Sequence, residues 1–293
     1  MRKKWHSKNT PGYFFILPAF LLLAIVTIFP YIYAVFISFQ KTKFGVAVGF
    51  NGLQNYIDVF ANSSFKVVIR NQIIIVLVSG FFQFLLGFSG ALALNKTKRS
   101  AFILRSAILI PWVIPGVVSG LLWKWILDGN SGVLNYLLQM IGMIDKQIPL
   151  LSSGFLALIC ILVVNIWRIY PFMMVMYLSG LQSVPSDQYE AACVDGATVT
   201  QRLRFITIPN MMPVITLTII LVTIWNFKIF DFIWVLTKGG PAGATEVFGT
   251  LIYKSSFSDL NFGFASAVAV IMGVIISIPI FINLKLKSKT ENL

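Results

Sequence analysis

Long uninterrupted apolar runs are the feature that most constrains this chain. Six of them lie at residues 13–39, 67–94, 102–127, 155–180, 211–237 and 263–284, and each reaches the roughly 20 residues that a helix needs to cross a bilayer. The composition is 57% hydrophobic and 11% charged, whereas soluble domains are usually about 45–50% apolar. The sequence therefore predicts an all-α, polytopic membrane bundle of six transmembrane helices.

Two runs carry further signals. The first is about twice as long as the ~7–15-residue core of a signal peptide and has no small-residue cleavage pattern, so we expect it to remain as an anchor. The third contains Pro111 and Pro115, which lack backbone donors and are expected to kink or interrupt its helix.

Lysine and arginine near the ends of the runs predict the topology, because cytoplasmic loops carry an excess of both. One side has thirteen, namely Arg2, Lys3, Lys4, Lys8, Lys96, Lys98, Arg99, Arg105, Arg202, Arg204, Lys285, Lys287 and Lys289. The other side has eight, namely Lys41, Lys43, Lys66, Arg70, Lys124, Lys146, Lys238 and Lys254. We therefore expect cytoplasmic tails at 1–12 and 285–293, a six-helix domain at 13–284, and a cytoplasmic loop at 181–209 within it.

Residues for covalent or metal chemistry are scarce. The chain has one histidine, His6, and two cysteines, Cys160 and Cys193, which form no metal-ligand cluster and no nucleophile–base pair of the histidine type. The glycine-rich stretch 239–245 lacks the Gly-Lys-Ser/Thr ending of a phosphate-binding loop. We therefore expect no enzyme activity, no metal and no cofactor in this chain.

The net charge of +13 is spread over short clusters beside the runs. This distribution favours contact with anionic lipid headgroups and argues against binding to nucleic acid, which needs a continuous basic stripe.

Polar side chains inside the runs are candidates for a solute route. Asn165 and Arg168 lie in the fourth run, and Asn226, Lys228 and Asp231 in the fifth. Facing lipid would be costly, so we expect them to face the bundle interior, a water-filled path or each other. Lys228 and Asp231 are three residues apart, which would place them on one helix face as an ion pair. An internal ion pair and a solute contact remain alternatives, and Arg168 has the further alternative of reaching an interface.

The loop at 181–209 predicts a helix, a tight turn and a second helix. Ser186 is expected to cap the first helix, and Asp195-Gly196 to end it, because glycine adopts the left-handed closing conformation. Thr198 and Gln201 have the spacing of a capping box for the second helix, which is expected to end near Pro209. Such a hairpin would either receive a partner protein or rest on lipid as an amphipathic element.

The same loop resembles the cytoplasmic signature of permeases in binding-protein-dependent ABC importers, in which a Glu-Ala-Ala opening precedes a glycine and an Ile-x-x-Pro ending. The matching residues are Glu190, Ala191, Ala192, Gly196, Ile206 and Pro209. Residues 230–241 and 262–267 resemble the carbohydrate-uptake branch, in particular the maltose- and glycerol-3-phosphate-type subunit. The likeness covers essentially the whole chain.

This resemblance implies a type I importer permease fold in a bacterial cell membrane and a set of partners. These are a sister permease, a cytoplasmic ABC ATPase dimer that binds the ATP, an extracytoplasmic solute-binding protein, and a sugar or sugar derivative as the solute. An amino-acid or peptide importer is the nearest alternative. An ion-coupled secondary transporter would need buried acidic ion sites, and Asp231 is the one clear acidic residue at depth.

The resemblance also assigns roles within the loop. Glu190 and the Ala191-Ala192 surface would dock to the ATPase, Asp195 and Gly196 would form the turn, Leu203 and Ile206 would supply apolar contacts, and Pro209 would join the loop to the fifth run. Two departures limit the match. Leu203 stands where many members have phenylalanine, and the chain lacks the large external domain of the enteric maltose subunit.

Overall fold

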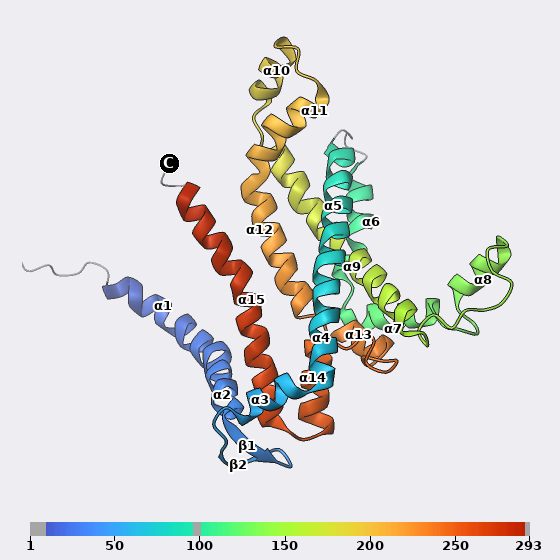
Figure 1. Cartoon of the computed structure of the whole chain (residues 1–293). Helices are drawn as coiled ribbons and strands as arrows, with labels where there is room; N and C mark the ends of the chain where they lie inside the picture. The colour runs from blue at the N-terminus through green and yellow to red at the C-terminus, as the bar shows by residue number, and fades with distance from the viewer. Residues whose placement is uncertain (1–9, 96–100, 291–293) are drawn as a thin grey trace, which may run out of the picture. The chain divides into compact units, whose positions relative to one another are not determined.

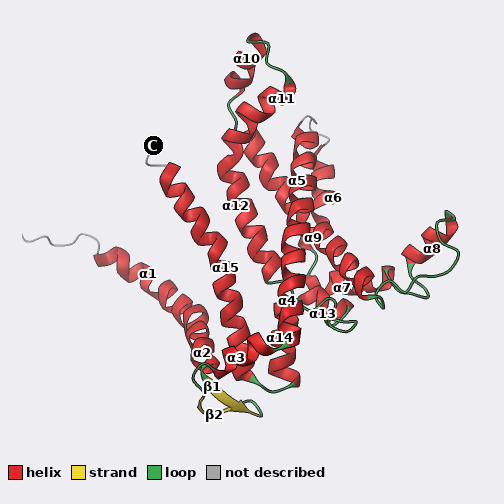
Figure 2. Cartoon of the chain, in the orientation of Figure 1, coloured by secondary structure: helices red, strands yellow, loops and turns green. Residues whose placement is uncertain are grey.

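The structure is a computed structural model that describes residues 10–95 and 101–290. Helices make up most of it, joined by loops and by a single pair of short strands within the described ranges (Figure 2). This confirms the all-α fold class. Several residues used in the predictions lie outside the described ranges: Arg2, Lys3, Lys4, His6, Lys8, Lys96, Lys98 and Arg99.

The chain divides into two compact units, and the first comprises Met1–Ala61 with Ile252–Ile271. Its elements are α1 (Thr10–Leu23), a π-helical turn (Ala24–Ile28), α2 (Phe29–Ser38), β1 (Gln40–Lys43), β2 (Val46–Phe50), α3 (Gln54–Ala61), a second π-helical turn (Lys254–Ser258) and the start of α15 (Phe262–Thr290). The strands pair antiparallel, and Asn55 ties them to the first span by donating to the carbonyl oxygens of Ser38 and Gln40, each at 2.8 Å. This hairpin was not among the predicted elements.

The second unit, Asn62–Leu251 with Met272–Leu293, contains the elements of the predicted sites. They are α4 (Ser63–Ile74), a π-helical turn (Ile75–Ser79), α5 (Gly80–Asn95), α6 (Ala101–Val113), α7 (Gly116–Ile126), α8 (Val133–Met140), α9 (Gly154–Gln182), α10 (Ser186–Val194), α11 (Val199–Arg202), a π-helical turn (Leu203–Thr207), α12 (Ile208–Phe227), α13 (Asp231–Leu236) and α14 (Phe248–Tyr253), which crosses the boundary between the units (Figure 1).

Five helical segments of the described chain are long and apolar enough to span a membrane, or six if a bent pair counts as one. The bent pair is the third predicted run, in which Arg105–Val113 and Gly116–Ile126 meet at 98°. Pro115 precedes the first residue of α7, where its missing N–H leaves no intrahelical bond unmade. The expected interruption is confirmed, and the third run is not a straight helix.

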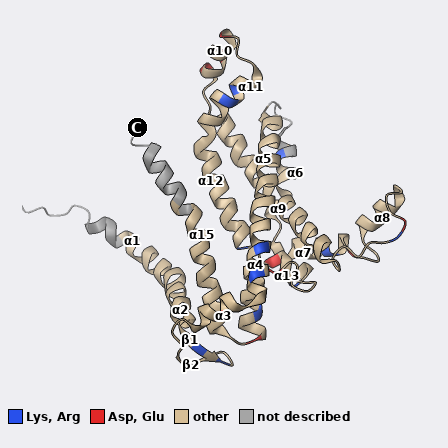
Figure 3. Ribbon diagram, in the orientation of Figure 1, with Lys and Arg blue, Asp and Glu red and all other residues tan. Residues whose placement is uncertain are grey.

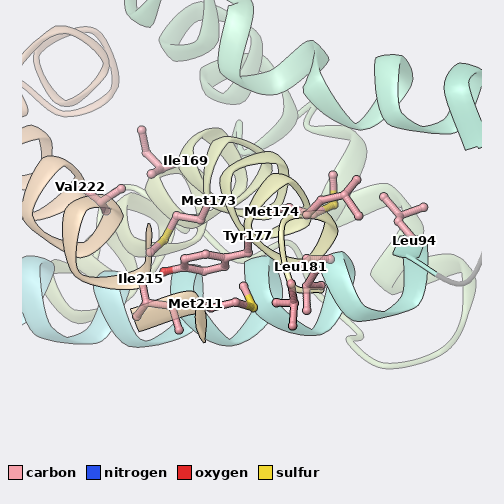
Figure 4. Close-up of a cluster of buried hydrophobic side chains, with 12 residues drawn as sticks. Leu94, Ile169, Met173, Met174, Tyr177, Leu181, Met211, Ile215 and Val222 are labelled. Atoms are coloured by element: carbon pink, nitrogen blue, oxygen red, sulfur yellow. The ribbon is translucent and has the colours of Figure 1, made fainter. Parts of the chain in front are cut away.

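The core of the second unit lies between α5, α9 and α12. Tyr177 of α9 is fully buried beside Met211 and Ile215 of α12 (Figure 4), and it meets the rings of Phe84 and Phe88 edge-on at 5.7 and 5.9 Å between centroids. Such ring pairs contribute about 0.5–1.5 kcal/mol each beyond burial alone.

Close approach of α5 to α9 depends on Gly87. A Cβ at this position would lie 2.8 Å from Cβ of Met173 and 3.1 Å from the backbone nitrogen of Met174. Small residues permit this kind of contact between membrane helices. The packing therefore fixes α5 and α9 side by side.

Candidate functional site

The hairpin between α9 and α12 has the predicted local construction. α10 ends at Val194, and Gly196 follows with φ of +74°, while the amides of Gly196 and Ala197 donate to the carbonyl oxygens of Cys193 and Ala192. These bonds close the helix in the way that glycine permits without strain. The predicted glycine turn is therefore confirmed.

The capping box of the second helix is also present. The Gln201 amide donates to Oγ1 of Thr198 at 3.3 Å, and the Thr198 amide donates to Oε1 of Gln201 at 2.7 Å. These reciprocal bonds satisfy two backbone donors that a helix start would otherwise leave unpaired. The start of α11 could thus be predicted from two residues.

Two local expectations are wrong. Ser186 is the first residue of α10, not its cap, and its hydroxyl donates to Oδ1 of Asp187 at 3.3 Å. The second helix also does not end near Pro209, because α11 passes through the π-helical turn Leu203–Thr207 directly into α12. Pro209 is the second residue of α12, directly after the π-helical turn.

The predicted docking residues differ in exposure. Glu190, Ala191, Asp195, Gly196 and Pro209 are exposed, whereas Ala192, Leu203 and Ile206 are half-buried. The hairpin also carries basic residues on and just after α11, where Figure 3 shows positive charge.

Three large apolar side chains of the hairpin were missed by the sequence reasoning. Val194 is 88% exposed, Val199 71% and Phe205 67%. The sequence shows that Val194 and Val199 flank the glycine turn, where exposure could have been expected. Phe205 belongs to the π-helical turn, so its exposure could not be read from the sequence.

Two of the predicted solute-route residues, Asn165 and Asn226, contact each other. Nδ2 of Asn165 donates to Oδ1 of Asn226 at 2.8 Å, and Nδ2 of Asn226 donates to Oε1 of Gln83 at 3.0 Å. Gln83 closes the ring by donating to the carbonyl oxygen of Asn165 at 3.2 Å. We call these three residues the amide lock. All are at most 2% exposed, so the lock joins α5, α9 and α12 inside the unit.

Lys228 and Asp231 do not share a helix face, so their expected pairing as neighbours on one helix is wrong. α12 ends at Phe227, Lys228 caps it, and Asp231 is the first residue of α13. Both side chains are exposed on the surface of this chain. Asp231 packs against α7 instead, since a Cβ at Gly116 would lie 2.9 Å from its Oδ2.

Arg168 lies three residues after Asn165 on α9 and is half-buried. Its guanidinium carbon is 5.3 Å from the centre of the Phe232 ring, and the carboxylate of Asp231 acts on it electrostatically. Its Nε is buried and has no hydrogen-bond partner among the described residues. Arg168 is thus brought together with Asp231 and α13, not with Lys228.

A stack of aromatic rings lies one helical turn further along α9. Phe172 meets Trp112 of α6 at 5.3 Å and Trp225 of α12 at 4.7 Å between ring centroids. Trp112 is 40% exposed. Sequence reasoning missed this stack, because the three residues come from three different runs.

Comparison with known proteins identifies the family of this chain. The model of the "binding-protein-dependent transport system inner membrane component" family matches residues 83–289. A probable ABC transporter permease protein of Brucella suis is 34% identical over 287 residues, covering 97% of this chain and 99% of that protein. The trehalose/maltose transport system permease protein MalF of Thermococcus litoralis is 32% identical, covering 90% and 89%.

Two further matches agree with these. The sulfoquinovosyl glycerol transport system permease protein SmoG of Agrobacterium fabrum is 33% identical, covering 87% of this chain and 83% of that protein. A chain in the crystal structure of a bacterial ABC transporter involved in the import of alginate has the same fold, with a TM-score of 0.82 at 22% identity over 96% of both chains. This chain therefore belongs to the family of inner membrane components of binding-protein-dependent transport systems.

Proposed function

We propose that this chain forms, with a sister permease, the membrane path of an ATP-driven importer for a sugar or sugar derivative. Two relatives that it resembles over most of their length are named for trehalose/maltose and sulfoquinovosyl glycerol transport. The chain has no catalytic role in this proposal and binds no cofactor. A separate ABC ATPase dimer binds ATP, and an external binding protein delivers the solute.

The observation that carries the proposal is the exposed hairpin α10–α11 with its glycine turn. Glu190, Ala191 and Gly196 lie on its surface, and a Cβ at Gly196 would meet nothing within 4 Å. The hairpin surface combines small residues at the turn with exposed charges and the exposed apolar side chains of Val194, Val199 and Phe205, a mixture that suits the groove of a partner protein. We infer that the ATPase docks here.

Phe205 supports an aromatic contact with the ATPase. Leu203 stands at the position where the family resemblance implies phenylalanine, but its side chain is half-buried, whereas Phe205 is 67% exposed. Both belong to the π-helical turn, which widens the helix and changes which side chains point outward. We propose that Phe205 makes the apolar contact assigned to Leu203.

The proposed orientation places both termini and the hairpin in the cytoplasm, and a native thiol can test it. Of the two cysteines, Cys160 is buried in α9 and Cys193 is exposed on α10. A membrane-impermeant maleimide should therefore label Cys193 in inside-out vesicles and not in intact spheroplasts. Labelling from the outer face would refute the orientation and the docking role together, and protection by added ATPase separates docking from a hairpin that rests on lipid.

Coupling is tested by Gly196→Asp and Glu190→Lys in the complex reconstituted into vesicles, with trehalose, maltose and sulfoquinovosyl glycerol as probes. We expect the variant chains to insert and to lose the link between ATP hydrolysis and uptake. At Gly196 a side chain would be strained because φ is +74°. Normal uptake per ATP in both variants would count against the hairpin as the coupling element.

For the solute route we propose Lys228, Asp231 and Arg168, while Asn165 and Asn226 hold the helices together. The first two are exposed charges near the end of a span, which lipid would disfavour and a water-filled path or sister chain would accept. Lys228→Met should alter which of the probe sugars is taken up while leaving the complex assembled. A loss that appears only as failed assembly would favour a structural role.

A further inference from the structure

Three side-chain contacts join α10 to the continuous helix that runs from α11 into α12. Nδ2 of Asn210 donates to Oε1 of Gln188 at 2.8 Å, and the hydroxyls of Tyr189 and Thr207 are 2.9 Å apart. Nη1 of Arg202 donates to Sγ of Cys193 at 2.8 Å. We call these three pairs the clasp. They lie at successive points along α10, so they act on its whole length.

The central pair of the clasp is connected to the packed core. Thr207 donates its own hydroxyl proton to the carbonyl oxygen of Arg202 at 3.3 Å, which leaves the Tyr189 hydroxyl as the donor between the two side chains. Thr207 is 4% exposed, and the Tyr189 ring packs with Ile206 against the core cluster that contains Met211 and Leu181. A hydrogen bond in this partly buried setting is stronger than one in water.

Toward α9, α10 contributes the apolar packing of Tyr189 against the cluster that contains Leu181. The link to α9 is the short segment Ser183–Pro185, and the Ser183 hydroxyl donates back into its own helix, to the carbonyl oxygen of Gly180 at 2.8 Å. Within the described ranges, no side-chain hydrogen bond joins α10 to α9. The hydrogen bonds of α10 therefore connect it to the helix that follows it in sequence.

We infer that the clasp makes α10 move with α12, so that Gln188, Tyr189, Thr207 and Asn210 are positioning residues for coupling. A displacement of α10 by its docked partner then passes to α12 through side chains as well as through the turn at Gly196. This inference rests on the proposed docking function, but it can fail alone. If Gly196→Asp and Glu190→Lys couple ATP hydrolysis to uptake as the wild type does, the proposed docking function fails. If those two variants are uncoupled and the clasp variants behave as wild type, the docking function stands and the clasp has no role.

The test uses the assembled complex in lipid, comparing its ATP hydrolysis with and without the binding protein. In Gln188→Leu/Tyr189→Phe, two clasp pairs are lost and the exposed docking residues are kept. We expect the ATPase to copurify normally and the stimulation by binding protein to fall about five-fold or more, as expected for two lost hydrogen bonds. Ser183→Ala is the matched control, because it removes a hydrogen-bonded hydroxyl that does not join α10 to α12, and it should leave the stimulation unchanged.

A rescue experiment distinguishes a positioning role of the clasp from a general disruption of the structure by the substitutions. In Gln188→Cys/Asn210→Cys/Cys193→Ser the pair between positions 188 and 210 loses its hydrogen bond, while the serine hydroxyl can still accept from Arg202, and a short thiol crosslinker such as dibromobimane can replace the lost contact. Linking should restore stimulation to about the wild-type level. The inference is overturned if the double variant keeps full stimulation, if it loses the ATPase altogether, or if the linked complex is inactive, since the last result would mean that the clasp must open.

Discussion

Replacing Asn226 by leucine should destabilise the protein through the groups that it leaves behind. The side chain of Asn226 accepts from Asn165 and donates to Gln83, and all three residues are at most 2% exposed. Its removal leaves one amide donor and one amide oxygen unpaired in the interior. An orphaned buried polar group costs ~1–3 kcal/mol, so the loss is about 2–6 kcal/mol.

Measurements on other membrane proteins set the lower limit, since hydrogen bonds between their helices average only ~0.6 kcal/mol. We expect a value above that average here, because the three side chains of the amide lock are at most 2% exposed. For a chain of 293 residues, 2 kcal/mol corresponds to a decrease in Tm of about 3 °C. Tryptophan fluorescence during heating in detergent would measure it.

Two further variants make this prediction decisive. Thr218→Val is the matched control on α12, since its buried hydroxyl donates only within its own helix, to the carbonyl oxygen of Val214. Gln83→Leu/Asn165→Leu/Asn226→Leu removes the unpaired side-chain amides and should recover much of the lost Tm. A single variant that melts with the wild type, or a triple variant that melts lower still, would refute the reasoning.

Three other substitutions test separate features. Gly87→Ala should lower the free energy of unfolding by about 1–3 kcal/mol, because the added Cβ meets Met173 at 2.8 Å, whereas Gly80→Ala, with nothing within 4 Å, should be neutral or stabilising in the same denaturation assay. Phe205→Ala should reduce the amount of ATPase that copurifies several-fold, and Leu203→Ala should reduce it less. A larger reduction in Leu203→Ala than in Phe205→Ala would show that Leu203 makes the apolar contact. The backbone amides of Ser131 and Asn130 donate to the Asp128 carboxylate and hold its pKa below its usual 3.8. The turn at 128–131 is therefore stabilised above pH 3.8 and loses this stabilisation as the pH falls through the lowered pKa. Asp128→Asn should increase protease cleavage of the turn at pH 7 and abolish the further increase that acid causes in the wild type.

Several features that depend on residues close together in the sequence were predicted correctly. The turn at Gly196 and the capping box of Thr198 and Gln201 each depend on residues a few positions apart, and both are present. The interruption of the third run at Pro115 likewise follows from one missing N–H. Features of this kind need no knowledge of what packs against them.

Features set by tertiary packing could not be predicted in the same way. The end of α12 at Phe227 separates Lys228 from Asp231, although the apolar run continues to residue 237. Asn226 was a candidate for the solute route because a polar side chain that faces lipid is costly. Its partner Gln83 lies 143 positions away, and only the fold brings the two together. Exposure of Phe205 depends on a π-helical turn, for which the sequence carries no strong signal.

The passage of α11 into α12 without a stop at Pro209 has a mechanical consequence. α12 alone is 20 residues long, which at 1.5 Å per residue is about 30 Å, comparable to the thickness of the hydrocarbon core. A rod of that length, tilted by about 10° about the end that carries the hairpin, would move its far end sideways by about 5 Å. Leverage of this size lets a modest push on the hairpin reach Lys228, at the opposite end of the same helix.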